Sequence, residues 1–179
     1  MNSSITSLEQ LITAFDDADP SEQVSVLKRI DIPVSDFAQY ATWSDECYTR
    51  NCIARRDGFE FILLCWSPGA VTPIHGHDGQ NCWVYQVEGS VREKRYQLSN
   101  DRFELTNDMT LDAGKLCYMH DRMGYHSLAN ESNKQSMTLH IYANPIDRCE
   151  VFNEERNRFE VVEMEYDSIE GNVVLPTGS

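Results

Sequence analysis

Two histidines separated by a single residue, His75 and His77, are the residues of this sequence most suited to chemistry. On a β-strand, side chains two positions apart point to the same face. We therefore expect this segment to be a strand whose two imidazoles meet one cation. Because imidazole binds iron, zinc, copper and nickel alike, the pair predicts a metal site without identifying the metal.

The spacing around this pair, G-x5-H-x-H-x4-C-x6-G, resembles the first motif of the cupin superfamily, with Cys82 where that family usually has an acidic ligand. The segment Gly124–Asn130 resembles the second motif, G-x-H-x3-N, in which His126 supplies a further ligand. Three neutral imidazoles leave a metal its full charge and several open positions. A catalytic metal needs both, whereas a structural zinc site is usually closed by four protein ligands.

A more specific resemblance, to the cysteine dioxygenases, covers about residues 45 to 150. Five stretches carry it in the family's order: Tyr48-Thr49-Arg50-Asn51, Phe61–Trp66, His75 to Cys82, Leu139-His140-Ile141-Tyr142 and Asn144–Cys149. The resemblance implies an all-β fold, a jelly-roll-like cupin-type β-barrel. It also implies Fe(II) held by His75, His77 and His126, and O2-dependent oxidation of L-cysteine to cysteine sulfinic acid.

The same resemblance implies roles for residues outside the metal site. Arg50, Tyr48, His140 and Tyr142 would bind the substrate, and Thr138 and Trp66 would form an outer hydrogen-bonded layer. Arginine is the natural clamp for a carboxylate, through a two-pronged and permanently charged fork. From the residues alone, Arg50 could equally be a solvated edge residue and Trp66 a plain core residue. His120 has no motif around it, so we expect it to be structural or at the surface.

Cys82, with Tyr142 and His140, belongs to the catalytic set that the family implies. In this interpretation Cys82 forms a thioether crosslink with Tyr142. Two alternatives stay open at this stage, namely Cys82 as a fourth metal ligand and Cys82 as a plain core cysteine.

Two other functions compete with cysteine oxidation. One is a related thiol dioxygenase acting on 3-mercaptopropionate, a branch that typically has Gln where Arg50 stands, so Arg50 favours cysteine. The other is a non-catalytic, metal-binding cupin, in which Cys82, Arg50, His140 and Tyr142 would all be incidental.

Composition limits the partners. The chain has 15 basic and 29 acidic residues, a net charge of −14, which disfavours nucleic acids and anionic membranes. It has neither a signal-like N-terminus nor a window of about 18 apolar residues. We therefore expect a cytoplasmic protein, and its six cysteines are read as reduced thiols. We expect a monomer whose substrates are L-cysteine and O2.

The 179 residues predict one domain with three parts. Residues 1–45 read as helices packed outside the barrel, with apolar positions at helical spacing and a capping box formed by Thr6 and Glu9. Residues 46–170 read as the cupin barrel, because short strands alternate with polar turns. Residues 171–179 read as a loose tail. The expected strands are 48–53, 59–66, 83–87, 91–98, 102–106, 116–119, 124–128, 137–142 and 159–166.

Overall fold

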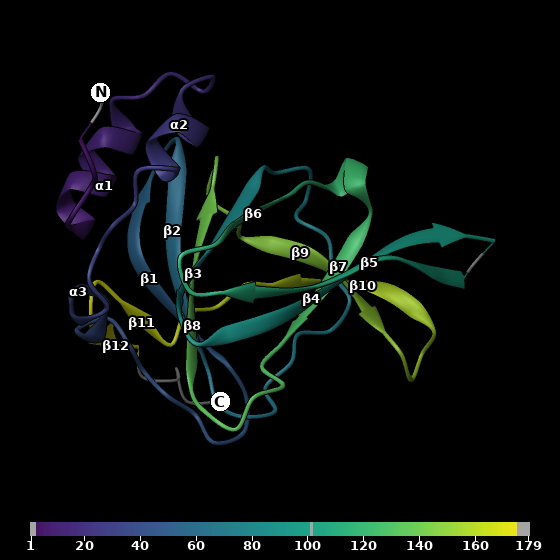
Figure 1. Cartoon of the computed structure of the whole chain (residues 1–179). Helices are drawn as coiled ribbons and strands as arrows, with labels where there is room; N and C mark the ends of the chain where they lie inside the picture. The colour runs from purple at the N-terminus through teal and green to yellow at the C-terminus, as the bar shows by residue number, and fades with distance from the viewer. Residues whose placement is uncertain (1–2, 101, 175–179) are drawn as a thin grey trace.

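The computed structural model describes residues 3–100 and 102–174, and it confirms the expected mostly β fold with few helices (Figure 1). The helices are α1 (Leu8–Asp16), α2 (Gln23–Leu27), α3 (Ser35–Ala38) and the 3-10 turn η1 (Asp121–Met123). The strands are β1 (Thr49–Arg56), β2 (Phe59–Trp66), β3 (Cys82–Glu88), β4 (Ser90–Ser99), β5 (Arg102–Asp112), β6 (Leu116–Met119), β7 (Tyr125–Ala129), β8 (Ser136–Tyr142), β9 (Arg148–Asn153), β10 (Arg158–Glu163), β11 (Ser168–Ile169) and β12 (Asn172–Val173). Among the described residues, no helix is both long and apolar enough to cross a membrane.

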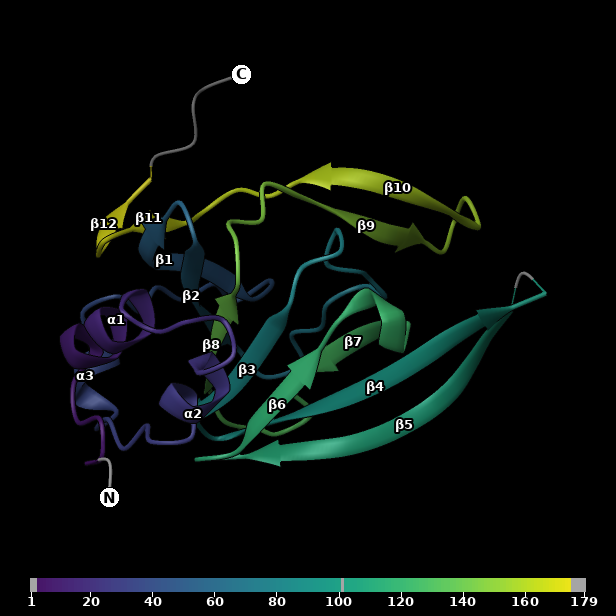
Figure 2. The same ribbon diagram turned by 90° about the horizontal axis from the view of Figure 1, so that it is seen from above.

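The strands of the described residues form three sheets. The largest has the order β12-β11-β1-β2-β8-β3-β6, and the others are β5-β4-β7 and β10-β9. Two hairpins, β4–β5 and β9–β10, extend away from the N-terminal helices (Figure 2). Aromatic rings join these hairpins, with Phe103 and Phe152 at a centroid distance of 4.7 Å.

Strands β2 and β8 lie at the centre of the large sheet and are buried along their whole length. Alternate side chains of β2 point to opposite sides, because a strand repeats every two residues. Phe61 and Leu63 pack towards the helices, whereas Ile62 and Leu64 pack inside the barrel. A strand covered on both faces favours apolar residues on both, which explains the unbroken run Phe61–Trp66.

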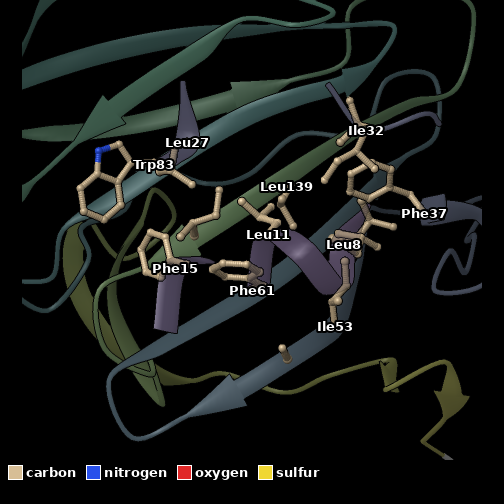
Figure 3. Close-up of a cluster of buried hydrophobic side chains, with 14 of the residues drawn as sticks. Leu8, Leu11, Phe15, Leu27, Ile32, Phe37, Ile53, Phe61, Trp83 and Leu139 are labelled. Atoms are coloured by element: carbon tan, nitrogen blue, oxygen red, sulfur yellow. The ribbon is translucent and has the colours of Figure 1, made fainter. Parts of the chain in front are cut away.

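The N-terminal helices cover the outer face of this sheet, as predicted (Figure 3). Phe15 of α1 is 1% exposed and makes edge-on contacts with the rings of Phe59 and Phe61. The predicted capping box is wrong in detail. Ser7, in extended conformation, caps α1 by accepting the N–H of Gln10.

Two further expectations differ from the structure. Strand β9 and the short pair β11–β12 were not predicted, and β12 includes Asn172 and Val173 of the expected tail. Residues 175–179 of that tail lie outside the described part of the chain. The division of the chain into a helical segment, a barrel and a tail stays a prediction.

Candidate active site

The segment that carries His75 and His77 is not a strand, contrary to the prediction. It forms only isolated bridges, at Val71 and His75, and directly after the pair, Asp78 and Gly79 adopt left-handed φ angles of 51° and 75°, which turn the chain away from an extended path. Pro73 also lacks an N–H group for a strand ladder. His75 instead makes an isolated pair with His126, in which each N–H donates to the other's carbonyl, at 2.9 and 3.1 Å. The irregular segment still brings the two histidines together, because β7 lies on one side of it and β9 on the other.

The imidazoles of His75, His77 and His126 converge, with one potential ligand atom from each lying within 4.8 Å of the others. The Nε2 atoms of His77 and His126 are 3.1 Å apart, and both residues are fully buried. Burial lowers the pKa of His126 to about 4 and that of His75 well below its usual value, so both rings are neutral at pH 7. Neutral imidazoles that face one another around a small space are the donor set that a metal ion requires.

A buried carboxylate, Glu93 on β4, orients His126, and the sequence analysis missed it. Its Oε1 lies 2.8 Å from His126 Nδ1, which fixes the hydrogen on Nδ1 and leaves Nε2 free as a ligand atom. The other oxygen contacts Arg95 at 2.9 Å and the thiol of Cys117 at 3.1 Å. Burial acts to raise the pKa of Glu93, but the hydrogen bonds from His126 and Arg95 lower it to about 2. The strand pattern could have indicated this position, because Glu93 lies two residues after Val91 and therefore points to the same, inward face.

A second carboxylate, Asp121, holds the turn after His77. Its two oxygens accept the main-chain N–H groups of His77 and Gly79, at 2.7 and 2.6 Å. These bonds replace the strand ladder that the sequence had suggested for this segment. Burial acts to raise the pKa of Asp121, but the contacts with His77 and Gly79 lower it to about 2. His120, beside it, caps η1 by accepting the N–H of Arg122, so its expected structural role is confirmed.

Two of the three converging histidines, His75 and His77, line a cavity of about 160 Å³ inside the barrel. Its walls bring together all four predicted substrate-binding residues, Tyr48, Arg50, His140 and Tyr142. This volume lies below the roughly 300–1,000 Å³ of pockets for drug-sized ligands, and therefore suits a very small molecule. A larger hollow of about 860 Å³ lies on the outer side of the sheet, beside α1 and α2, and none of the histidines lines it.

Arg50 presents an unpaired donor to this cavity. Its Nε donates to the carbonyl of Glu165 at 3.1 Å, and within the described residues its buried NH2 nitrogen has no hydrogen-bond partner. A buried donor without a partner is costly and indicates a missing acceptor. The guanidinium could therefore receive an anionic group of a bound molecule.

The inward-facing residues of β8 form a polar row. The Thr138 hydroxyl lies 2.8 Å from the indole nitrogen of Trp66, which donates to it, and 3.0 Å from His140 Nε2. Trp66 therefore does more than fill the core, because it fixes the Thr138 hydroxyl. Tyr48 packs on Trp66 at a centroid distance of 5.0 Å. Burial lowers the pKa of His140 well below its usual value, so its ring is neutral.

Cys82 and Tyr142 are directly opposite each other on the neighbouring strands β3 and β8. Both are buried, and burial raises the pKa of each group, so both the thiol and the phenol are protonated. Cys82 is a free cysteine here, as are the other five. In the described part of the chain, the group of potential metal ligands consists of the three histidines and does not include Cys82.

Comparison with solved structures supports the fold. The chain superposes on a crystal structure from Thermus thermophilus with a TM-score of 0.51 and 21% identity, covering 61% of this chain and 94% of the other. It superposes on a Klebsiella pneumoniae protein described as having a double-stranded β-helix domain with a TM-score of 0.50 and 14% identity, covering 71% of this chain and 94% of the other. These similarities concern the fold alone.

Sequence comparison identifies the family. The chain is 27% identical to cysteine dioxygenase type 1 of Rattus norvegicus over 161 residues, which cover 87% of this chain and 80% of the relative. It is 26% identical to the Homo sapiens protein of the same name over 167 residues, covering 90% and 82%. The profile of the family described as cysteine dioxygenase type I matches residues 2–155. The chain therefore belongs to the cysteine dioxygenase type I family and is an enzyme of the thiol dioxygenase class.

Proposed function

We propose that the chain oxidises L-cysteine to cysteine sulfinic acid with O2, using Fe(II) bound by His75, His77 and His126. The thiol takes up both atoms of one O2 molecule, so the atoms balance without another reductant. The observation that supports this proposal most is that the imidazoles of His75, His77 and His126 converge beside a small cavity, which His75 and His77 line together with Arg50, and that a buried guanidinium nitrogen of Arg50 has no hydrogen-bond partner among the described residues.

The residues around the cavity have separate tasks in this proposal. Arg50 binds the substrate carboxylate through a charged hydrogen bond, with Tyr48 beside it at the cavity wall. His140, oriented by Thr138, and the Tyr142 phenol line the cavity and offer polar groups to the substrate. A bound Fe(II) would supply a site for the thiolate and the ability to activate O2.

We also propose that Cys82 and Tyr142 become joined by a thioether bond. Their direct opposition on neighbouring strands supports this, because it holds the sulfur close to the phenol. Formation of the bond breaks one S–H and one ring C–H bond and makes one C–S bond. O2 accepts the two protons and two electrons that are released and becomes hydrogen peroxide. The link would remove a thiol that could compete for the metal.

Oxygen consumption by the iron-loaded protein with a panel of thiols tests the main proposal. L-cysteine should be oxidised faster than 3-mercaptopropionate, which lacks the amine, and faster than cysteamine, which lacks the carboxylate. Mass spectrometry should find a product heavier than cysteine by two oxygen atoms. Failure to consume O2 with any thiol, in protein that carries iron, would contradict the proposal.

Arg50→Gln tests the assignment of the carboxylate site. A charged hydrogen bond in a buried site is worth about 1.5–3 kcal/mol, which corresponds to roughly a 10- to 150-fold loss in kcat/KM for L-cysteine. Cysteamine oxidation should change little. Arg92→Gln is the matched control, since Arg92 forms ion pairs with Asp108 and Glu131 at the surface. Equal losses for L-cysteine and cysteamine would show that Arg50 does not act on the carboxylate.

A further inference from the structure

The segment beyond β10 holds Arg50 through the two neighbours of Tyr166, namely Glu165 and Asp167. The Arg50 N–H donates to the carboxylate of Asp167 at 2.7 Å, and its carbonyl accepts the Asp167 N–H at 2.8 Å. On the other side of Tyr166, the carbonyl of Glu165 accepts Arg50 Nε at 3.1 Å. A movement of Tyr166 would therefore shift the contacts that fix both the backbone and the side chain of Arg50.

The direction of the Arg50 guanidinium depends on this segment, because few other contacts hold it. No carboxylate in the described residues forms an ion pair with it, and its hydrogen bond to the Glu165 carbonyl is the only one from the side chain to the described protein. A long, flexible side chain held at one point takes its direction from that point. A shift of the Glu165 carbonyl would therefore redirect the unpaired nitrogen within the cavity.

Tyr166 is anchored by a buried carboxylate, Glu60 on β2. The Tyr166 hydroxyl donates to Glu60 Oε1 and accepts a hydrogen bond from Arg55 NH1 at 2.7 Å. Glu60 is fully buried, and its other oxygen accepts the N–H of Ile146 at 3.1 Å. A buried carboxylate is tolerated only where such partners compensate it, so these contacts fix one another's geometry.

The same anchor joins two walls of the cavity. Ile146, which Glu60 holds, lines the cavity, and so does Met164, two residues before Tyr166. Met164 is fixed in turn by its N–H bond to the carbonyl of Asp147, whose carboxylate contacts Arg55 at 2.7 Å. The carboxylate of Glu60 thus connects the central sheet to the two segments that shape the Arg50 end of the cavity.

We propose that Tyr166, held by Glu60, is a positioning residue that sets where Arg50 presents its guanidinium to the substrate carboxylate. The proposal rests on the proposed function in one respect, namely that Arg50 binds a carboxylate. Neither Tyr166 nor Glu60 lines the cavity. Their effect reaches the substrate through the Glu165 carbonyl and Arg50.

Tyr166→Phe tests the proposal, because it removes only the hydroxyl that Glu60 holds. KM for L-cysteine should rise about five-fold, the equivalent of one modest hydrogen bond, while kcat stays within about two-fold. KM for cysteamine and the iron content should be unchanged. Tyr118→Phe is the matched control, since its hydroxyl donates to Asn81 at 2.7 Å outside the cavity. An equal rise in KM for both thiols, or no rise for L-cysteine, would overturn the proposal.

A second variant covers the case in which Tyr166→Phe folds poorly. Glu60→Gln keeps the side-chain shape but removes the charge, and it should produce the same difference between L-cysteine and cysteamine. Both substitutions act on the same contact, that between the Tyr166 hydroxyl and Glu60. Their effects on KM should therefore be less than additive in the double variant. Additive effects would contradict the proposed chain of contacts.

Binding without turnover separates this proposal from the proposed function. Under anaerobic conditions, L-cysteine should raise the melting temperature of the iron-loaded protein, and Tyr166→Phe should reduce that shift. Cysteamine should give the same shift in both proteins. If no thiol is oxidised but the L-cysteine shift is still reduced, the proposed reaction fails and the positioning role stands. An undiminished shift in Tyr166→Phe overturns the positioning role.

Discussion

Glu93→Gln should weaken metal binding, because the fully buried Glu93 orients His126. The protein should stay folded. The substitution keeps the side-chain volume but removes the charge that His126 and Arg95 share. An amide nitrogen placed at Oε2 would also face the Arg95 guanidinium and the Cys117 thiol, which are both donors. A carboxylate–histidine contact of this kind is typically worth about 10- to 100-fold in metal affinity.

The assay is equilibrium binding of Co(II), a spectroscopic substitute for Fe(II), to the metal-free protein under anaerobic conditions. The dissociation constant of Glu93→Gln should rise by about 10- to 100-fold, equivalent to about 1.4–2.7 kcal/mol. Glu131→Gln is the matched control, because Glu131 forms its ion pair with Arg92 at the surface. A folded Glu93→Gln protein that binds Co(II) as tightly as the wild type would refute the argument that Glu93 orients a ligand.

Other buried groups allow three more tests. Peptide mass spectrometry after prolonged turnover with iron, cysteine and O2 should find Cys82 and Tyr142 in one linked species lighter by two hydrogens; separate, unmodified peptides would end the crosslink proposal. The pKa of His126 is lowered from 6.5 to about 4, so unfolding of the metal-free protein takes up a proton between these values. Stability should therefore fall as the pH falls, by about 2 kcal/mol from this residue at pH 5, and urea denaturation of His126→Gln should give a shallower dependence. Phe15→Ala should cost about 3–5 kcal/mol in urea denaturation, because Phe15 is 1% exposed, whereas the exposed Leu98→Ala should cost little.

The sequence was most informative where chemistry and periodicity coincide. Thr138, His140 and Tyr142 occupy alternate positions of the expected strand 137–142, and the structure places all three inside the barrel on β8. Alternation along a strand is a local property, so it can be read from the chain itself. The convergence of His126 with the histidine pair depended instead on a family resemblance, because 49 residues separate His77 from His126.

The misreading of the segment around His75 has a tertiary cause, namely contacts made by a distant side chain. His75 and His77 suggested a strand, although Pro73 and Gly79 already marked an irregular segment. The Asp121 carboxylate then takes the N–H groups that a neighbouring strand would have bound. Such compensation depends on the tertiary structure, so it cannot be deduced from local propensity.

The apolar layer beneath the helices helps to fix the register of β8, and with it the alignment of the inward row of polar side chains. The outward β8 residues Met137, Leu139 and Ile141 belong to this layer, and the residues between them line the interior. A slip of one residue would press an imidazole and a phenol into that layer, at the cost of burying unpaired polar groups. A slip of two would keep the faces but separate Tyr142 from Cys82. The apolar layer therefore opposes a slip of one residue, because the change of register that would displace the inward polar side chains also costs stability.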